Sequence, residues 1–138
     1  WGVYSEQLAN EMGLYSNDVQ QLGRLGNDAW RACRLVLDTG MHGMGWSRNS
    51  AIEFFRGNSP IEEINANIET DRYIAWPGQA CSYKMGQLTI EQLRKKAEEE
   101  LGDKFDIRYF HDEVLCDGGI TLPILENKID SFIEKFKN

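Results

Sequence analysis

The sequence predicts an all-α protein, an irregular bundle of about six to seven helices. Apolar residues recur at spacings of three and four along most of the chain, which is the period of an amphipathic helix. Glycine, proline and short polar residues stand between these stretches, where helices usually begin and end. No stretch alternates apolar and polar residues as a half-buried strand does, and no internal repeat is present.

The first two predicted helices occupy residues 2–13 and a longer stretch that begins at Asn17. The first carries apolar side chains three to five residues apart and ends at a glycine. Asn17 favours a helix start because its side chain can accept from the free amides of the first turn. The second helix should turn inward a face made of Leu22, Leu25, Ala29, Cys33, Val36, Leu37 and Gly40.

The third and fourth helices are predicted from their N-terminal caps. Ser47 opens the third helix, which ends near Gly57. Ser59, Pro60 and Glu62 then predict a new start, since they match a serine cap, a proline in the first turn and the glutamate of a capping box. The inward face of this fourth helix is expected at Ile61, Ile64, Ile68 and Tyr73, and Pro77-Gly78 should end it.

Three further helices complete the prediction. Residues 79–102 form the fifth, with a solvent-facing side rich in Lys and Glu and an inward side of Ala80, Tyr83, the Met85–Leu88 region, Leu93, Ala97 and Leu101. Asp103 or Asp106 starts the sixth, and Gly118-Gly119 stops it. Thr121 caps the last helix, whose apolar stripe is Leu122, Leu125, Ile129, Phe132, Ile133 and Phe136.

The composition is that of one globular domain, residues 1–138. With 41% hydrophobic and 27% charged residues, the chain can bury roughly two thirds of its unfolded surface. The net charge of −7 argues against nucleic acid and anionic membranes as partners, because both need clustered Lys and Arg. No apolar run approaches the roughly 20 residues of a membrane span. The chain starts at Trp1 without a signal peptide, so we expect a segment of a larger helical protein and assign no compartment.

The three cysteines, Cys33, Cys81 and Cys116, are far apart and odd in number. This pattern favours buried thiols in a reducing compartment over a disulfide framework. One bridge and one free thiol is the alternative.

His42 lies in the run D-T-G-M-H-G-M-G-W-S-R, between Gly40, Gly43 and Gly45. Each glycine in a helix interior costs roughly 1 kcal/mol relative to alanine, so a chain accepts glycines where a helix ends or where a group must approach closely. One interpretation is that His42 faces a crowded cleft. The other is a histidine whose hydrogen bonds are satisfied at a contact between two helices.

A second cluster of interest is R-Y-I-A-W-P-G-Q-A-C-S-Y-K, in which Tyr73 and Tyr83 flank the Pro-Gly break. Phenol hydroxyls at a helix break can point into a cleft and donate to an oxyanion. Alternatively, both tyrosines are core aromatics with polar tips. Arg34 precedes Asp38 by four residues, which suits an ion pair as well as it suits substrate binding.

The residues themselves supply no complete zinc site. The chain has two distant histidines, no H-E-x-x-H motif and no paired cysteines, so a closed set of metal ligands is lacking.

Four segments together resemble a known family: W-G-V-Y-S-E-Q-L-A-N-E-M-G-L-Y, the run that holds His42, R-Y-I-A-W-P-G-Q-A-C-S-Y-K-M-G, and F-D-I-R-Y-F-H-D. They are similar to the C-terminal part of the bacterial "domain of unknown function 885" proteins, which are helical and similar to zinc metallopeptidases of the gluzincin type. In that family a histidine–glutamate zinc motif and an E-G-W-x-L-Y-x-E stretch come earlier. Trp1 matches the tryptophan of that stretch, so the resemblance implies that every zinc ligand lies upstream of this chain.

The resemblance also implies roles for several residues. Glu6 would orient zinc ligands, and His42 and Tyr83, with Tyr73 as a substitute, would stabilise the tetrahedral oxyanion. Arg72 or Arg34 would receive a peptide carboxylate.

On this interpretation the chain is the cleft-lining, C-terminal part of a zinc-dependent peptidase and is inactive by itself. Its partners would be a peptide substrate and the upstream part of the same polypeptide. The alternative is a non-catalytic helical domain that binds a peptide or protein. In either case, faces around Trp30, Trp46 and Trp76 could pair with another copy.

Overall fold

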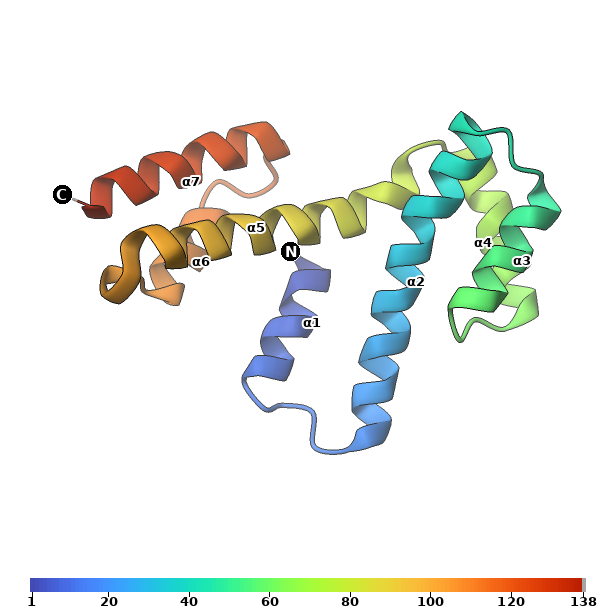
Figure 1. The fold of residues 1–138 in the computed structure, drawn as a ribbon, viewed down its shortest axis with the longest axis horizontal. Helices are drawn as coiled ribbons and strands as arrows, with labels where there is room; N and C mark the ends of the chain where they lie inside the picture. The colour runs from blue at the N-terminus through green and yellow to red at the C-terminus, as the bar shows by residue number, and fades with distance from the viewer. Residues whose placement is uncertain (138) are drawn as a thin grey trace. The chain divides into compact units, whose positions relative to one another are not determined.

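The computed structural model describes residues 1–137 and contains seven α-helices in that range (Figure 1). They are α1 (Gly2–Glu11), α2 (Asp18–Gly43), α3 (Arg48–Asn58), α4 (Glu63–Ala75), α5 (Ser82–Leu101), α6 (Ile107–Leu115) and α7 (Leu122–Lys137). Two single turns of 3-10 helix, η1 (Gln79–Cys81) and η2 (Gly102–Lys104), flank α5. The described residues include no strand, and the predicted all-α class is confirmed.

Two compact units make up the chain: Trp1–Met85, here unit 1, and Gly86–Asn138, here unit 2. Their boundary falls inside α5, four residues after the helix begins. The prediction of one domain over residues 1–138 stays a prediction. None of the helices within residues 1–137 is long and apolar enough to cross a membrane.

The core of unit 1 lies where α2, α3, α4 and η1 pack together. Phe55 is its fully buried centre, with the ring of Trp30 edge-on at 5.9 Å and the ring of Tyr73 at 6.3 Å. The buried members are Cys33, Leu37, Ala51, Ile52, Phe55, Ala66, Tyr73 and Ala80. Large aromatic rings therefore hold the C-terminal half of α2 against α4.

Both ends of α2 form where the sequence predicts them. The Asn17 side chain accepts from the amide of Gln20 at 3.0 Å, as predicted for the cap. At the other end Gly45 takes a positive φ of 70°, so the chain reverses and Trp46 folds back onto Gly40. A Cβ at Gly40 would lie 2.7 Å from the indole ring, so the glycine makes room for the tryptophan.

The inward face predicted for α2 is wrong in its N-terminal half. Leu22 and Leu25 are 69% and 52% exposed, and burial of α2 begins only at Cys33; beyond that point Val36, also expected inside, is 39% exposed. Helical periodicity shows which face is apolar, but it does not show whether another element of the chain covers that face.

The predicted start of α4 at Ser59 is also wrong, because the helix begins at Glu63. The Ser59 hydroxyl and amide both donate back to the carbonyl of Phe55, so this residue ends α3 instead of capping α4. The predicted inward face is wrong as well, since Ile64 and Ile68, which were expected inside, are 66% and 59% exposed. The buried face of α4 is Ala66, Thr70 and Tyr73.

Unit 2 follows its predicted pattern closely. The Asp106 side chain caps α6 by accepting from the amide of Arg108 at 2.8 Å. The core of unit 2 is formed by Ile90, Leu93, Ala97, Leu101, Phe110, Val114, Leu125, Ile129, Phe132 and Ile133. Of the stripe predicted for the last helix, Leu125, Ile129, Phe132 and Ile133 are buried, and Leu122 and Phe136 are partly buried.

All three cysteines are free thiols, but only Cys33 is buried. Cys81 is partly buried and Cys116 is exposed, so the expectation of buried thiols holds for one of the three. Burial raises the pKa of the Cys33 thiol above its ordinary value.

Candidate functional site

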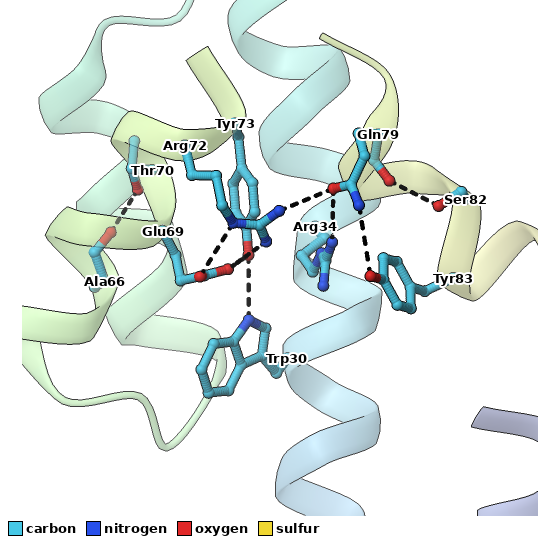
Figure 2. A network of polar contacts seen from close by, with 10 residues as sticks. All are labelled: Trp30, Arg34, Ala66, Glu69, Thr70, Arg72, Tyr73, Gln79, Ser82 and Tyr83. Carbon is cyan, nitrogen blue, oxygen red and sulfur yellow. Dashed lines mark hydrogen bonds and ion pairs between the residues drawn. The ribbon is translucent and has the colours of Figure 1, made fainter. Parts of the chain in front are cut away.

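Four side chains of α2 spaced four residues apart form a row that faces α4 and η1. Trp30 Nε1 donates to the hydroxyl of Tyr73 at 3.2 Å, and Arg34 donates to the side chain of Gln79 at 3.3 Å (Figure 2). Further along the helix, Asp38 accepts from a backbone amide of the Pro-Gly break and His42 contacts a backbone carbonyl. The row follows from helix geometry, since residues four apart share one face.

The Pro-Gly break positions η1 over this row. Gly78 has a positive φ of 82°, which glycine adopts without strain, and its amide lies 3.0 Å and 2.9 Å from the two carboxylate oxygens of Asp38. Asp38 is buried, so this hydrogen bond stabilises its charge as well as the turn. The turn carries Gln79 toward α2 and starts the helix that bears Tyr83.

On the α4 side, Arg72 and Glu69 form a two-point ion pair. Arg72 Nε and Nη2 donate to the two oxygens of Glu69 at 3.2 Å and 2.7 Å. Burial works against the ionised form of Glu69, but the hydrogen bonds from Arg72 and Tyr73 outweigh it and lower the pKa of this carboxyl. The bond to Glu69 in turn raises the pKa of Arg72.

The Tyr73 hydroxyl is already committed to partners inside the protein. It donates to Glu69 at 2.6 Å and accepts from Trp30, and the residue is 1% exposed. Burial and the bond to Glu69 raise the pKa of Tyr73 to about 12, so its phenol stays protonated at neutral pH. Of the two interpretations of Tyr73, the geometry favours a core aromatic with a satisfied polar tip.

Arg34 is the most unusual member of the cluster. It is 5% exposed, and its guanidinium lies between the rings of Tyr83 at 4.2 Å and Tyr73 at 5.2 Å. Its Nη2 and Arg72 Nη1 donate to the same amide oxygen of Gln79, at 3.3 Å and 2.9 Å. The buried Nε atom of Arg34 has no hydrogen-bond partner. Within residues 1–137, no carboxylate forms an ion pair with Arg34, and Asp38 bonds to Gly78 instead.

Tyr83 was expected to point inward, but it is 42% exposed. Its ring covers Arg34, and its hydroxyl accepts from the amide nitrogen of Gln79 at 3.5 Å. Tyr83 lies in the first turn of α5, and there its ring packs over the guanidinium of Arg34 instead of against the apolar core.

His42 does not join the two arginines. Its Nε2 lies 3.0 Å from the carbonyl of Tyr73, which can only accept, so Nε2 carries the proton in this contact. The residue is exposed and is eight positions from Arg34, about 12 Å along the helix axis. This geometry matches the interpretation of a histidine satisfied at a contact between helices.

Glu6 lies on α1, where its backbone carbonyl accepts from the hydroxyl of Tyr15 at 3.3 Å. None of the described contacts of the arginine–tyrosine cluster involves Glu6. No group of three His, Cys, Asp or Glu residues within the described chain is arranged to hold a metal ion.

Sequence reasoning missed Gln79, Glu69 and the role of Trp30. The signal that could have found them is the spacing of Trp30, Arg34, Asp38 and His42, which puts four polar-tipped side chains on one face of a helix that was interpreted from its apolar stripe.

These observations define a helical protein whose first unit encloses a cationic, tyrosine-lined cluster. Residues 1–129 match the family described as bacterial protein of unknown function DUF885. The chain belongs to this family.

A solved structure supports the fold. The crystal structure of a protein described as a "putative lipoprotein" from Colwellia psychrerythraea is similar to this chain with a TM-score of 0.94 and 43% sequence identity. The similarity covers 98% of this chain but 23% of that protein. No curated protein matches the chain.

Proposed function

We propose that this chain is the substrate-binding wall of a zinc-dependent peptidase, in which it binds and orients a peptide. The proposal rests on the family's resemblance to gluzincin-type metallopeptidases, together with the polar cluster of unit 1. The zinc ion would be held by residues outside this chain, most simply by an upstream part of the same polypeptide.

The observation that carries the proposal is the pair Arg34 and Arg72 converging on one neutral oxygen of Gln79. Guanidinium groups bind carboxylates through paired N–H donors. A peptide presents such a group at its C-terminus, and Arg34 and Arg72 lie at positions where the family resemblance expects substrate to bind.

In this proposal Tyr83 supplies a hydrogen bond to the oxygen of the reacting carbonyl group. Its hydroxyl is partly exposed and weakly held, whereas that of Tyr73 is buried between Glu69 and Trp30. Tyr73 then acts as a positioning residue that holds Arg72 through Glu69. His42 can act as a second donor to the carbonyl oxygen only if its ring leaves the backbone carbonyl of Tyr73. Glu6 remains a candidate for orienting zinc ligands.

The test is hydrolysis of a peptide by a protein that joins this chain to the upstream zinc-binding sequence. We expect zinc-dependent cleavage that falls about 10²–10³-fold in Tyr83→Phe, the usual loss for one oxyanion donor. The Tyr109→Phe variant changes an exposed tyrosine of unit 2 and should retain full activity. Full activity of Tyr83→Phe would remove this residue from the mechanism, and absence of zinc-dependent cleavage would overturn the proposal.

A second candidate function is a non-catalytic domain that binds a peptide or protein. It is favoured by a shallow groove on α2 lined by Val19, Leu22, Gly23, Gly26, Asn27, Trp30 and Pro60, where Val19 and Leu22 are 78% and 69% exposed. This candidate predicts no stoichiometric zinc in the longer protein, which metal analysis decides. The same apolar face would favour self-association of the chain, and sedimentation at increasing concentration would detect it.

A further inference from the structure

We propose that the Gln79 side chain is a placeholder for a carboxylate, and that a ligand with a free C-terminal carboxylate displaces it from Arg34 and Arg72. This inference rests on the proposed function and specifies its substrate class: peptides bound by their C-terminal end, as an exopeptidase binds them. It adds a role for Gln79, a residue to which neither the sequence pattern nor the family description assigns one.

The first argument is the balance of charge in the cluster. Glu69 compensates Arg72 through a two-point ion pair, and Tyr73 also donates to that carboxylate. Arg34 is 5% exposed, and its hydrogen bond and cation–π contacts are to a neutral amide and two aromatic rings, while Glu69 acts on it only through its charge. A guanidinium is charged at every accessible pH, and a buried charge is costly unless an opposite charge or several hydrogen bonds compensate it. Within the described chain, Arg34 therefore has no carboxylate bonded directly to it, and a bound carboxylate would supply one.

The second argument is the number of donors and acceptors. One amide oxygen of Gln79 accepts from both arginines, and the buried Nε of Arg34 has no partner. A carboxylate has two oxygens, each with two lone pairs, and can accept from both guanidinium groups at once. A carboxylate would therefore accept hydrogen bonds from Arg34 and Arg72, including donors that the single amide oxygen of Gln79 leaves without a partner.

The third argument is that, apart from the two arginine bonds that a carboxylate would take over, little holds the Gln79 side chain in place. It belongs to a single 3-10 turn, is partly exposed, and its amide nitrogen reaches the Tyr83 hydroxyl only at 3.5 Å, the outer limit of a hydrogen bond (Figure 2). When the side chain rotates away, the guanidinium groups of Arg34 and Arg72 are left as donors around one space. Two cationic groups that can only donate favour a carboxylate over a neutral amide.

The probes for the test are N-acetyl-alanyl-alanine and its C-terminal amide, which differ only in the terminal charge. Calorimetric titration of the chain should show saturable binding of the acid and at least tenfold weaker binding of the amide. Equal binding of the two probes, or no saturable binding of the acid, would overturn the inference.

The decisive variant is Gln79→Glu, which places a carboxylate next to both arginines without changing the size of the side chain. We expect it to raise the midpoint of thermal unfolding and to weaken binding of N-acetyl-alanyl-alanine at least tenfold. The reason is that the new carboxylate of the protein itself then pairs with Arg34 and Arg72. Gln92→Glu adds the same charge on the exposed side of α5 and should change neither quantity. A Gln79→Glu variant that binds the acid as tightly as the unsubstituted chain would overturn the placeholder role.

The outcomes separate this inference from the proposed function. Acid-selective binding without zinc-dependent hydrolysis in the longer protein would uphold the carboxylate site and overturn the peptidase. Hydrolysis of peptides whose C-terminus is amidated, at the rate of the free acids, would uphold the peptidase and overturn the carboxylate site.

Discussion

The two units of this chain bury different chemistry. Unit 1 buries an arginine and an aspartate, Arg34 and Asp38, along with Thr70 and Tyr73. Within the described part of unit 2, the buried residues are aliphatic and aromatic apart from Gln87 and Thr89, and none is charged. The charges of unit 2 instead form surface pairs, such as Arg94 with Glu98 and Lys95 with Glu99, four residues apart on α5.

This difference indicates which unit is built for stability and which for binding. Surface pairs of the kind found on α5 are worth little, about 0–1 kcal/mol each, so unit 2 is held together by its hydrocarbon core. A buried arginine adds less to stability than an apolar residue of the same volume, and retaining one suggests another purpose. The candidate site is therefore expected to lie entirely in unit 1.

The largest effect that tests this comparison is expected from Phe110→Ala in unit 2. Phe110 is fully buried, and truncating such a ring costs about 3–5 kcal/mol through lost burial and the cavity left behind. Urea unfolding measures the loss. The neighbouring Tyr109→Ala variant, 55% exposed, is the control and should cost less than about 1 kcal/mol. A loss below 1 kcal/mol for Phe110→Ala would mean that unit 2 does not depend on its core.

The second prediction concerns the polar core of unit 1. Tyr73→Phe removes one hydroxyl, which takes one donor from Glu69 and leaves the indole N–H of Trp30 without its acceptor, while Arg72 still pairs with Glu69. We expect a loss of about 2–3 kcal/mol in the free energy of unfolding, because a hydrogen bond to a charged group is lost and the part-buried Trp30 N–H stays unsatisfied. Tyr109→Phe is the matched control and should be nearly neutral. If both variants unfold at the same urea concentration, the polar contacts of unit 1 contribute nothing to stability.

The third prediction compares two glycines of α2. A Cβ at Gly40 would meet the indole of Trp46 at 2.7 Å, whereas one at Gly43 meets nothing within 4 Å. Gly40→Ala should cost about 1–2 kcal/mol, since crowding outweighs the helix propensity that alanine gains. Gly43→Ala should leave stability unchanged or raise it by up to about 1 kcal/mol. Opposite signs of the two changes in thermal unfolding would confirm that Gly40 serves packing; equal signs would contradict it.

The fold was predictable where local signals decide the outcome. The caps at Asn17, Ser47 and Asp106 and the break at Pro77-Gly78 formed as expected, because each depends on a side chain or a turn within a few residues. The start of α4 was not predictable in the same way. Ser59 can cap the following helix or end the preceding one, and the sequence does not show which carbonyl or amide it will bond.

The candidate site was predictable in its residues more than in its contacts. Arg34, Arg72, Tyr73 and Tyr83 do converge, but that convergence depends on contacts between α2 and segments some 40 residues later, which periodicity cannot reveal. The pairing of Arg34 with Asp38 suggested by their spacing does not form. Asp38 bonds to Gly78 across the turn, and this frees Arg34 to face Gln79.

The smallest predicted effect tests whether the Arg72–Glu69 ion pair of unit 1 differs from a surface pair. Since the pKa of Glu69 is lowered in the folded chain, its ionised form stabilises the fold above the ordinary value near 4.5, and this contribution is lost as pH falls through the lowered value. Glu69→Gln should therefore unfold more easily than the unsubstituted chain at pH 7, by about 1 kcal/mol, and the difference should shrink below pH 4.5. Glu99→Gln, which breaks an exposed pair on α5, should change stability by less than about 0.5 kcal/mol at either pH. Urea unfolding of the three proteins at pH 7 and pH 3 measures both differences. A difference for Glu69→Gln that is the same at both values would show that its charge has no part in holding Arg72 and Tyr73, and the contrast between the partly buried Arg72–Glu69 pair of unit 1 and the surface pairs of unit 2 would then lose its energetic basis.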